Sequence, residues 1–149
     1  MNIAKRMTIL AAALALACAT ATPALAGGSA GAGIFTQSGN GQSSTGAGLI
    51  LSSSNGVPVI PVSVGLTGFV PLASGGGYAV TVDGKFSFGR NAIGAGYGIG
   101  QFGAAHSGGM ATLFLDHKIA PLTTFELRGY RTMGGQGATA GFAGLTFSL

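Results

Sequence analysis

The acidic side chains of this sequence are each followed, two residues later, by a basic side chain. The three pairs are Asp83 with Lys85, Asp116 with Lys118, and Glu126 with Arg128. Positions two apart share a face of a β-strand, so each acid could reach its base if these segments are strands. Such a set could line a path for protons or ions, or it could form a salt-bridge network inside a lumen, where unpaired charges are costly.

Two of these pairs lie in segment 110–133, which alternates strictly between apolar and polar positions on both sides of Ala120 and Pro121. A period of two residues is typical of β-strands. The segment therefore predicts a hairpin with one apolar and one charged face and a short turn at Ala120 and Pro121. In this hairpin we expect Asp116 to lie opposite Arg128.

Further alternating segments are separated by clusters of Gly, Ser, Asn and Pro, and none has a sustained helical period. They cover residues 30–38, 44–53, 58–70, 78–88, 93–100 and 140–149. With the hairpin they make eight strands, about the length a tilted strand needs to cross a bilayer. The sequence predicts an all-β protein, an antiparallel up-and-down eight-stranded transmembrane β-barrel. Residues 54–56 are expected to form a turn, and the glycines of 93–100 to make room for aromatic side chains of neighbouring strands.

Residues 1–26 have the pattern of a cleaved secretory signal peptide, with Lys5 and Arg6 before an apolar run and small residues before Gly27. We expect one domain, an outer-membrane β-barrel of residues 27–149. Cys18 lies inside the signal, and Ala15 stands where a lipoprotein signal usually has leucine, so lipidation is not expected. An exported barrel without cysteine is held together by something other than disulfides.

The composition limits the class of protein. Of seven Lys and Arg, two lie in the signal, so five remain against three Asp and Glu; a net charge near +2 is too small and scattered to indicate a nucleic-acid partner. Charged residues are 7% of the chain, which also has 29 Gly and no Trp, so it would make a poor surface for a soluble globule. Either the outer surface does not face water, or the chain assembles.

The polar face of the strands has the character of a lumen. Its glycines outnumber its charges, and Phe69, Phe114 and Phe142 share it, which fits the filled interior of a small barrel. The polar exceptions on the apolar face, His117 and Arg131, lie near strand ends, where long side chains reach the headgroups. We therefore expect the apolar face to contact lipid, the charge pairs to form a structural network in the lumen, and Arg131 to contact lipopolysaccharide phosphates.

The run 115–122, followed by 125–130, resembles the periplasmic hairpin of eight-stranded outer-membrane barrels of the OmpA and OmpX kind. The alternating end Leu145, Phe147 and Leu149 is similar to the C-terminal signal by which such proteins are inserted. The resemblance implies the outer membrane of a Gram-negative-type bacterium. It also implies outer-membrane lipid, lipopolysaccharide and the insertion machinery as partners of a monomer.

His106 and Ser107, with Glu126 elsewhere, are the candidates for hydrolase chemistry, but no oxyanion-hole motif accompanies them. His106 and His117 have no cysteine or second histidine at metal-ligand spacing. We expect no catalysis, no metal and no cofactor, and a structural or membrane-maintenance role. Two alternatives stay open: a soluble secreted β-barrel that binds an apolar ligand, and a Gly-rich extracellular β-fibre subunit.

Overall fold

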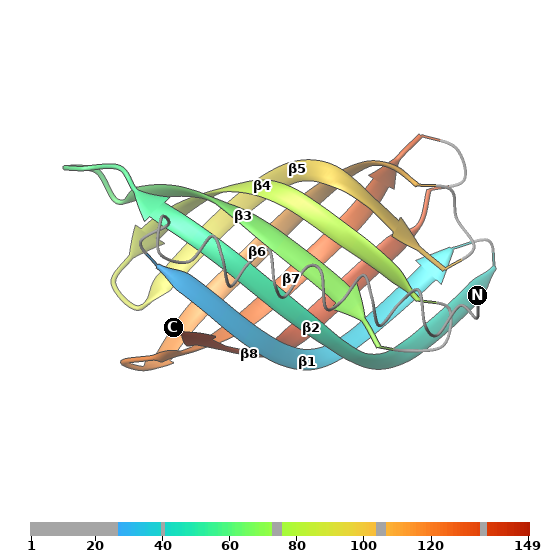
Figure 1. Cartoon of the computed structure of the whole chain (residues 1–149), viewed down its shortest axis with the longest axis horizontal. Helices are drawn as coiled ribbons and strands as arrows, with labels where there is room; N and C mark the ends of the chain where they lie inside the picture. Colours follow the sequence, from blue (N-terminus) through green and yellow to red (C-terminus); the bar gives the residue numbers. More distant parts are fainter. Residues whose placement is uncertain (1–26, 40, 73–75, 104–106, 135–136) are drawn as a thin grey trace.

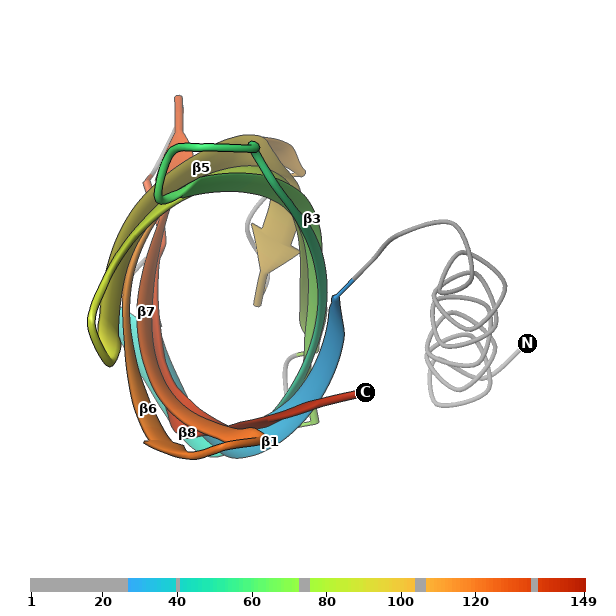
Figure 2. The same ribbon diagram turned by 90° about the vertical axis from the view of Figure 1, so that its left-hand side faces the viewer.

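The alternating segments fold into eight antiparallel strands, each paired with its neighbours in chain order, and β8 pairs with β1 to close the barrel (Figures 1 and 2). The computed structural model describes residues 27–149 except 40, 73–75, 104–106 and 135–136. The strands are β1 (Gly28–Gly39), β2 (Gln42–Gly56), β3 (Val62–Pro71), β4 (Gly77–Phe88), β5 (Asn91–Phe102), β6 (Gly108–Ala120), β7 (Thr123–Met133) and β8 (Thr139–Ser148). The predicted barrel is confirmed. The predicted signal peptide lies outside the described residues.

The two ends of the barrel differ in what they carry. The start of β1 at Gly28 and the C-terminal Leu149 lie at one end, where the Leu149 amide donates to the Gly28 carbonyl, together with the turns that join β2 to β3, β4 to β5 and β6 to β7; we call this the terminus end (Figure 1). The other four connections lie at the opposite end, which we call the loop end. No helix of the described residues is long and apolar enough to span a bilayer.

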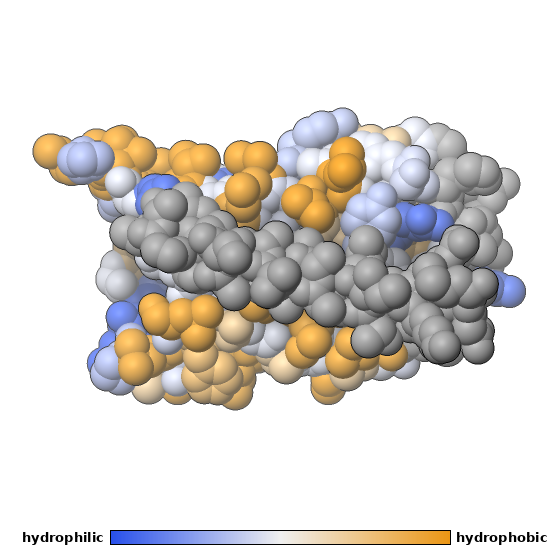
Figure 3. All heavy atoms as spheres, in the orientation of Figure 1, coloured by the Kyte–Doolittle hydropathy of each residue, from blue (hydrophilic) through white to orange (hydrophobic). Residues whose placement is uncertain are grey.

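Alternation places the apolar side chains outside and the polar and aromatic ones inside. The neighbours Ile34 and Phe35 show the contrast, because their exposed fractions are 67% and 0%. Apolar residues lie along the visible wall of the barrel in Figure 3. The exposed large apolar side chains on the strands include Ile34, Leu49, Val64, Leu66, Val82, Ile93, Ile99, Leu113, Leu115 and Leu127.

The connection between β2 and β3 differs from the expectation. The predicted turn at 54–56 is wrong, because these residues are the end of β2 and pair with residues 63–65 of β3. The predicted third strand, 58–70, loses its first residues to a loop at 57–61. Pro58 and Pro61 flank the tip of this loop, and a proline has no amide hydrogen for the ladder. At the tip, Val59 has a φ of 77°.

The register of the β6–β7 hairpin also differs. Asp116 lies opposite Glu126, and Arg128 lies opposite Phe114, so the expected pairing of Asp116 with Arg128 is wrong. The turn is tight, since Ala120 pairs with Thr123, and the register then shifts between Lys118 and Ala120. Such a bulge leaves one residue unpaired and changes which residues face each other.

Candidate functional site

The half of the lumen nearer the loop end is filled by aromatic rings. Phe69 is in the middle of this group, and its ring centroid lies 5.1 Å from that of Phe35 and 5.4 Å from that of Tyr130. Offset and edge contacts at such distances are favourable. The group, which we call the aromatic cluster, consists of Phe35, Phe69, Phe102, Tyr130 and Phe142, and all five side chains are buried. These rings close the lumen across its width.

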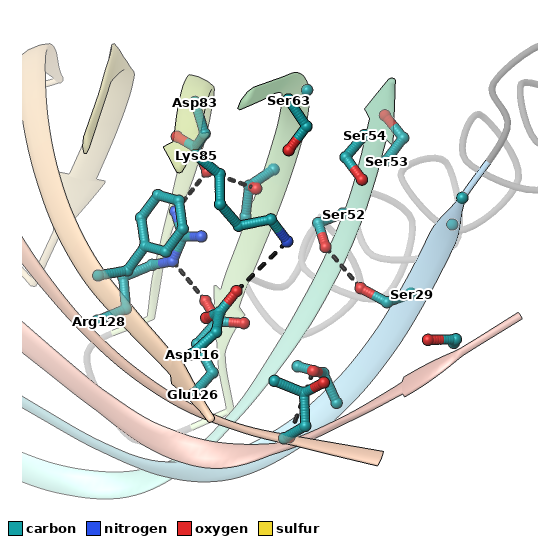
Figure 4. A pocket seen from close by; sticks show the side chains of 18 of the residues that line it. Ser29, Ser52, Ser53, Ser54, Ser63, Asp83, Lys85, Asp116, Glu126 and Arg128 are labelled. Carbon is teal, nitrogen blue, oxygen red and sulfur yellow. Dashed lines mark hydrogen bonds and ion pairs between the residues drawn. The ribbon is translucent and has the colours of Figure 1, made fainter. Parts of the chain in front are cut away.

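The half nearer the terminus end holds charges centred on Arg128. Its Nη1 donates to Asp83 Oδ2 at 2.6 Å, and its Nε donates to Glu126 Oε1 at 2.6 Å (Figure 4). The Thr67 hydroxyl also donates to Asp83 Oδ2, at 2.7 Å. Both carboxylates and the guanidinium are buried, so one cation compensates two anions in a site that bulk water does not screen.

A second, looser ion pair completes the set. Lys85 Nζ lies 3.4 Å from Asp116 Oδ2, and the Lys85 side chain is 31% exposed. The Arg128 guanidinium also stacks on Phe114, with its Cζ 4.0 Å from the ring centroid. On the side of the aromatic cluster, the Arg128 Cζ lies 6.0 Å from the ring centroid of Tyr130. We call Asp83, Lys85, Asp116, Glu126 and Arg128 the charge network.

Glycines of β5 make this arrangement possible. A Cβ on Gly94 would collide with the ring of Phe114, and one on Gly96 would collide with the Asp83 carboxylate. β5 contributes no side chain at these two inward positions, and across it Lys85 of β4 pairs with Asp116 of β6. The expectation that these glycines make room for neighbouring side chains is confirmed for Phe114.

A polar cavity of about 190 Å³ lies between the charge network and the terminus end (Figure 4). Its wall near the mouth is made largely of serines, and the hydroxyl oxygens of Ser29 and Ser52 are 2.6 Å apart. Within the described residues, Asp116 Oδ1 is buried and has no protein hydrogen-bond partner. A polar cavity of this size has room for several water molecules, which satisfy such atoms. Phe114 and Arg128 line the cavity, and no ring of the aromatic cluster does.

The structure places the predicted site residues as follows. Glu126 and Arg128 form the expected pair within one strand, but Asp83 pairs with Arg128 across the lumen, and Asp116 pairs with Lys85. Lys118 is exposed near the end of β6 and belongs to none of the ion pairs of the described residues. The expected pairs of Asp83 with Lys85 and of Asp116 with Lys118 are therefore absent.

Sequence reasoning did not identify Thr67 and the serines at the mouth as partners of the charges. Thr67 and these serines, apart from Ser53, occupy inward positions. The alternation therefore indicated that they face the lumen, but it did not show which strands would face one another. Arg131 is exposed toward the loop end of β7. Of the hydrolase candidates, His106 lies outside the described residues, and Glu126 is held by Arg128. No cluster of His, Cys, Asp and Glu among the described residues could hold a metal ion.

The fold of the chain was compared with those of known proteins. No protein-family model matches the chain, and no curated protein matches its sequence. Solved structures do match. Neisserial surface protein A is 11% identical, with a TM-score of 0.59 over 83% of this chain and 96% of that protein. The chain has the fold of small outer-membrane barrels.

Two further structures agree. Ail of Yersinia pestis is 12% identical, with a TM-score of 0.53 over 83% of this chain and 98% of that protein. The N-terminal β-barrel domain of Pseudomonas aeruginosa OprF is 14% identical, with a TM-score of 0.52 over 81% of this chain and 97% of that domain. The expected resemblance to eight-stranded outer-membrane barrels is confirmed at the level of the fold.

Proposed function

We propose that the chain is a small integral outer-membrane barrel with a structural or membrane-maintenance role and without catalysis. The observation that carries this proposal is the placement of charge. All three acidic side chains face the lumen, while the outer wall is lined by exposed Ile, Leu, Val and Phe. Exposed apolar area of this extent is unfavourable in water and favourable in lipid.

The edges of the apolar wall support the same proposal. Four outward phenylalanines lie near the terminus end: Phe86, Phe88, Phe125 and Phe147. Toward the loop end, Tyr97 and Arg131 lie on either side of Ala111 in the sheet. Amphipathic and cationic side chains such as these two are favoured at the headgroups. In this orientation the terminus end, with the turn at Pro121 and Leu122, faces the periplasm, and Arg131 faces the lipopolysaccharide phosphates.

Both alternative functions fit the structure less well. A soluble barrel that binds an apolar ligand needs a polar exterior and an apolar cavity, whereas this chain has an apolar exterior and a polar cavity. A β-fibre subunit needs a free strand edge, but β1 and β8 pair with each other, so no described strand has one. The aromatic cluster also argues against a transport path, because it closes the lumen.

Insertion through the C-terminal strand is part of the proposal. Leu145, Phe147 and Leu149 alternate on the outer surface of β8 and at its end, with exposed fractions of 39%, 50% and 77%. They are available to a folding factor before the barrel meets the bilayer. A monomer suffices for this role, since the barrel closes within one chain.

Cell fractionation tests the proposal. The full chain is expressed in a Gram-negative host, and its membranes are washed with alkaline carbonate and run on a gel before and after heating. We expect retention in the outer-membrane fraction and a mobility shift on heating. Release into the wash would support the soluble barrel, and insolubility in boiling detergent would support the fibre.

A further inference from the structure

An apolar groove runs over the outer surface of β7 and β8. Its floor is formed at Gly129 and Gly141, which pair directly with each other, and it holds about 620 Å³. Its walls include Ile34, Leu113, Leu127 and Ala143. A Cβ on Gly129 would meet no atom within 4 Å, so the space above the floor is open.

A cation lies just beyond the lining of this groove, on the side nearer the loops. Arg131 is the next outward residue of β7 after Gly129, it is exposed, and it pairs with the small residues Ala111 and Thr139. The three acidic side chains of the chain all lie in the lumen, and the C-terminus lies at the other end of the barrel. None of these carboxyl groups is therefore placed to pair with Arg131, and its guanidinium can bind an anion from outside the chain.

The geometry points to a lipid site: the groove binds one acyl chain of a phosphorylated outer-leaflet lipid of the lipid A kind, and Arg131 binds its phosphate. The inference rests on the proposed membrane location. The positions of Arg131 and the groove match the shape of such a lipid. Arg131 is at the level of the headgroups, and the groove runs from it toward the middle of the outer surface, where the acyl chains lie. Guanidinium groups bind phosphate through two parallel hydrogen bonds, which would fix the headgroup above the groove.

Two variants test the site, and a third is a matched control. Gly129→Leu fills the groove, and Arg131→Gln removes the cation. Gly84→Leu adds the same side chain on the outer face of β4, in the same row of paired residues. The nearest atom to a Cβ at Gly84 is the Ala95 carbonyl oxygen at 3.9 Å, so both glycines accept a side chain without a clash.

The full chain is expressed in a Gram-negative host, purified from its outer membrane and placed in phosphatidylcholine vesicles with increasing diphosphoryl lipid A. The readout is the temperature at which the heat-modified band appears, which rises when a ligand binds the folded state. We expect lipid A to raise this temperature equally for the wild type and Gly84→Leu. Gly129→Leu and Arg131→Gln should each need about tenfold more lipid A for the same rise, since each loses a few buried methylenes or one charge-assisted contact.

Each other outcome has a defined meaning. If Gly129→Leu responds to lipid A like the wild type, the site is overturned. The transition temperature could instead depend on protein concentration and on Gly129, but not on lipid A. That result would overturn the lipid site and indicate that a second copy of the chain occupies the groove. A protein that never enters the vesicles would contradict the proposed membrane location itself, which separates that failure from a failure of the groove.

Discussion

The two halves of the lumen are built by the same strands and the same alternation, yet they are closed in different ways. In the half nearer the loop end, five aromatic rings pack against one another, and the Tyr130 hydroxyl is buried among the described residues without a protein hydrogen-bond partner. In the half nearer the terminus end, the inward residues are charged or small, and a cavity of about 190 Å³ remains. Aromatic rings therefore fill one half of this barrel, while the buried charges of the other half line a polar cavity.

The largest effect is expected from the centre of the charged half. Arg128→Ala leaves Asp83 and Glu126 buried without a cation, so we expect the free energy of unfolding in vesicles to fall by about 5 kcal/mol. Urea titration of the heat-modifiable band measures it. Adding Asp83→Asn and Glu126→Gln should recover most of the loss. A triple variant as unstable as Arg128→Ala would show that the loss has another cause.

The centre of the aromatic half comes next. Phe69→Ala removes the ring that contacts Phe35, Phe102, Tyr130 and Phe142, and we expect a loss of about 4 kcal/mol. Because water can then pass the gap, conductance across a planar bilayer should rise above that of the wild type. Phe69→Leu, which keeps most of the volume, is the control. Unchanged conductance in Phe69→Ala would contradict closure by rings.

Glu126→Gln tests whether the charged half of the lumen, unlike the aromatic half, affects stability without affecting conductance. It removes a charge that Arg128 compensates but keeps an acceptor oxygen, and it relieves the repulsion from Asp116 on the neighbouring strand. We expect a loss of about 1 to 2 kcal/mol and no change in conductance. A large gain in conductance would instead show that the charge network controls a path through the barrel.

The smallest effect is expected at Lys85. Its ion pair with Asp116 is long and partly exposed, so Lys85→Met should cost less than about 1 kcal/mol in the same urea titration. A loss as large as that of Arg128→Ala would mean that the two ion pairs act as one unit, and the distinction between a buried and a partly exposed pair would fail.

Much of the fold could be predicted from the alternation of apolar and polar residues along the sequence. It predicted the continuous strand through Asp83 and Gly84 and the inward glycines of β5, because a period of two residues is a local property of the chain. It did not predict the end of β2, since residues 54–56 have the composition of a turn. There the tertiary pairing with β3 overrides local preference, and the two prolines that follow move the turn by several residues.

The candidate site was predictable as a set of inward positions but not as a set of pairs. Pairing depends on register, and the bulge near Lys118 changes the register of the hairpin. It depends equally on what the strand between two charges lacks, since a side chain at Gly94 would collide with Phe114 and one at Gly96 with Asp83. Neither feature can be derived from the spacing of the charges along one strand.

A single tryptophan tests the central claim, that the apolar wall faces lipid. The chain contains no tryptophan, so the indole of Leu113→Trp on the outer face of β6 reports alone. In vesicles we predict strong quenching by phosphatidylcholine brominated on its acyl chains and little by aqueous acrylamide, with the reverse for Val59→Trp in the β2–β3 loop. Quenching of Leu113→Trp by acrylamide but not by the brominated lipid would contradict the membrane barrel.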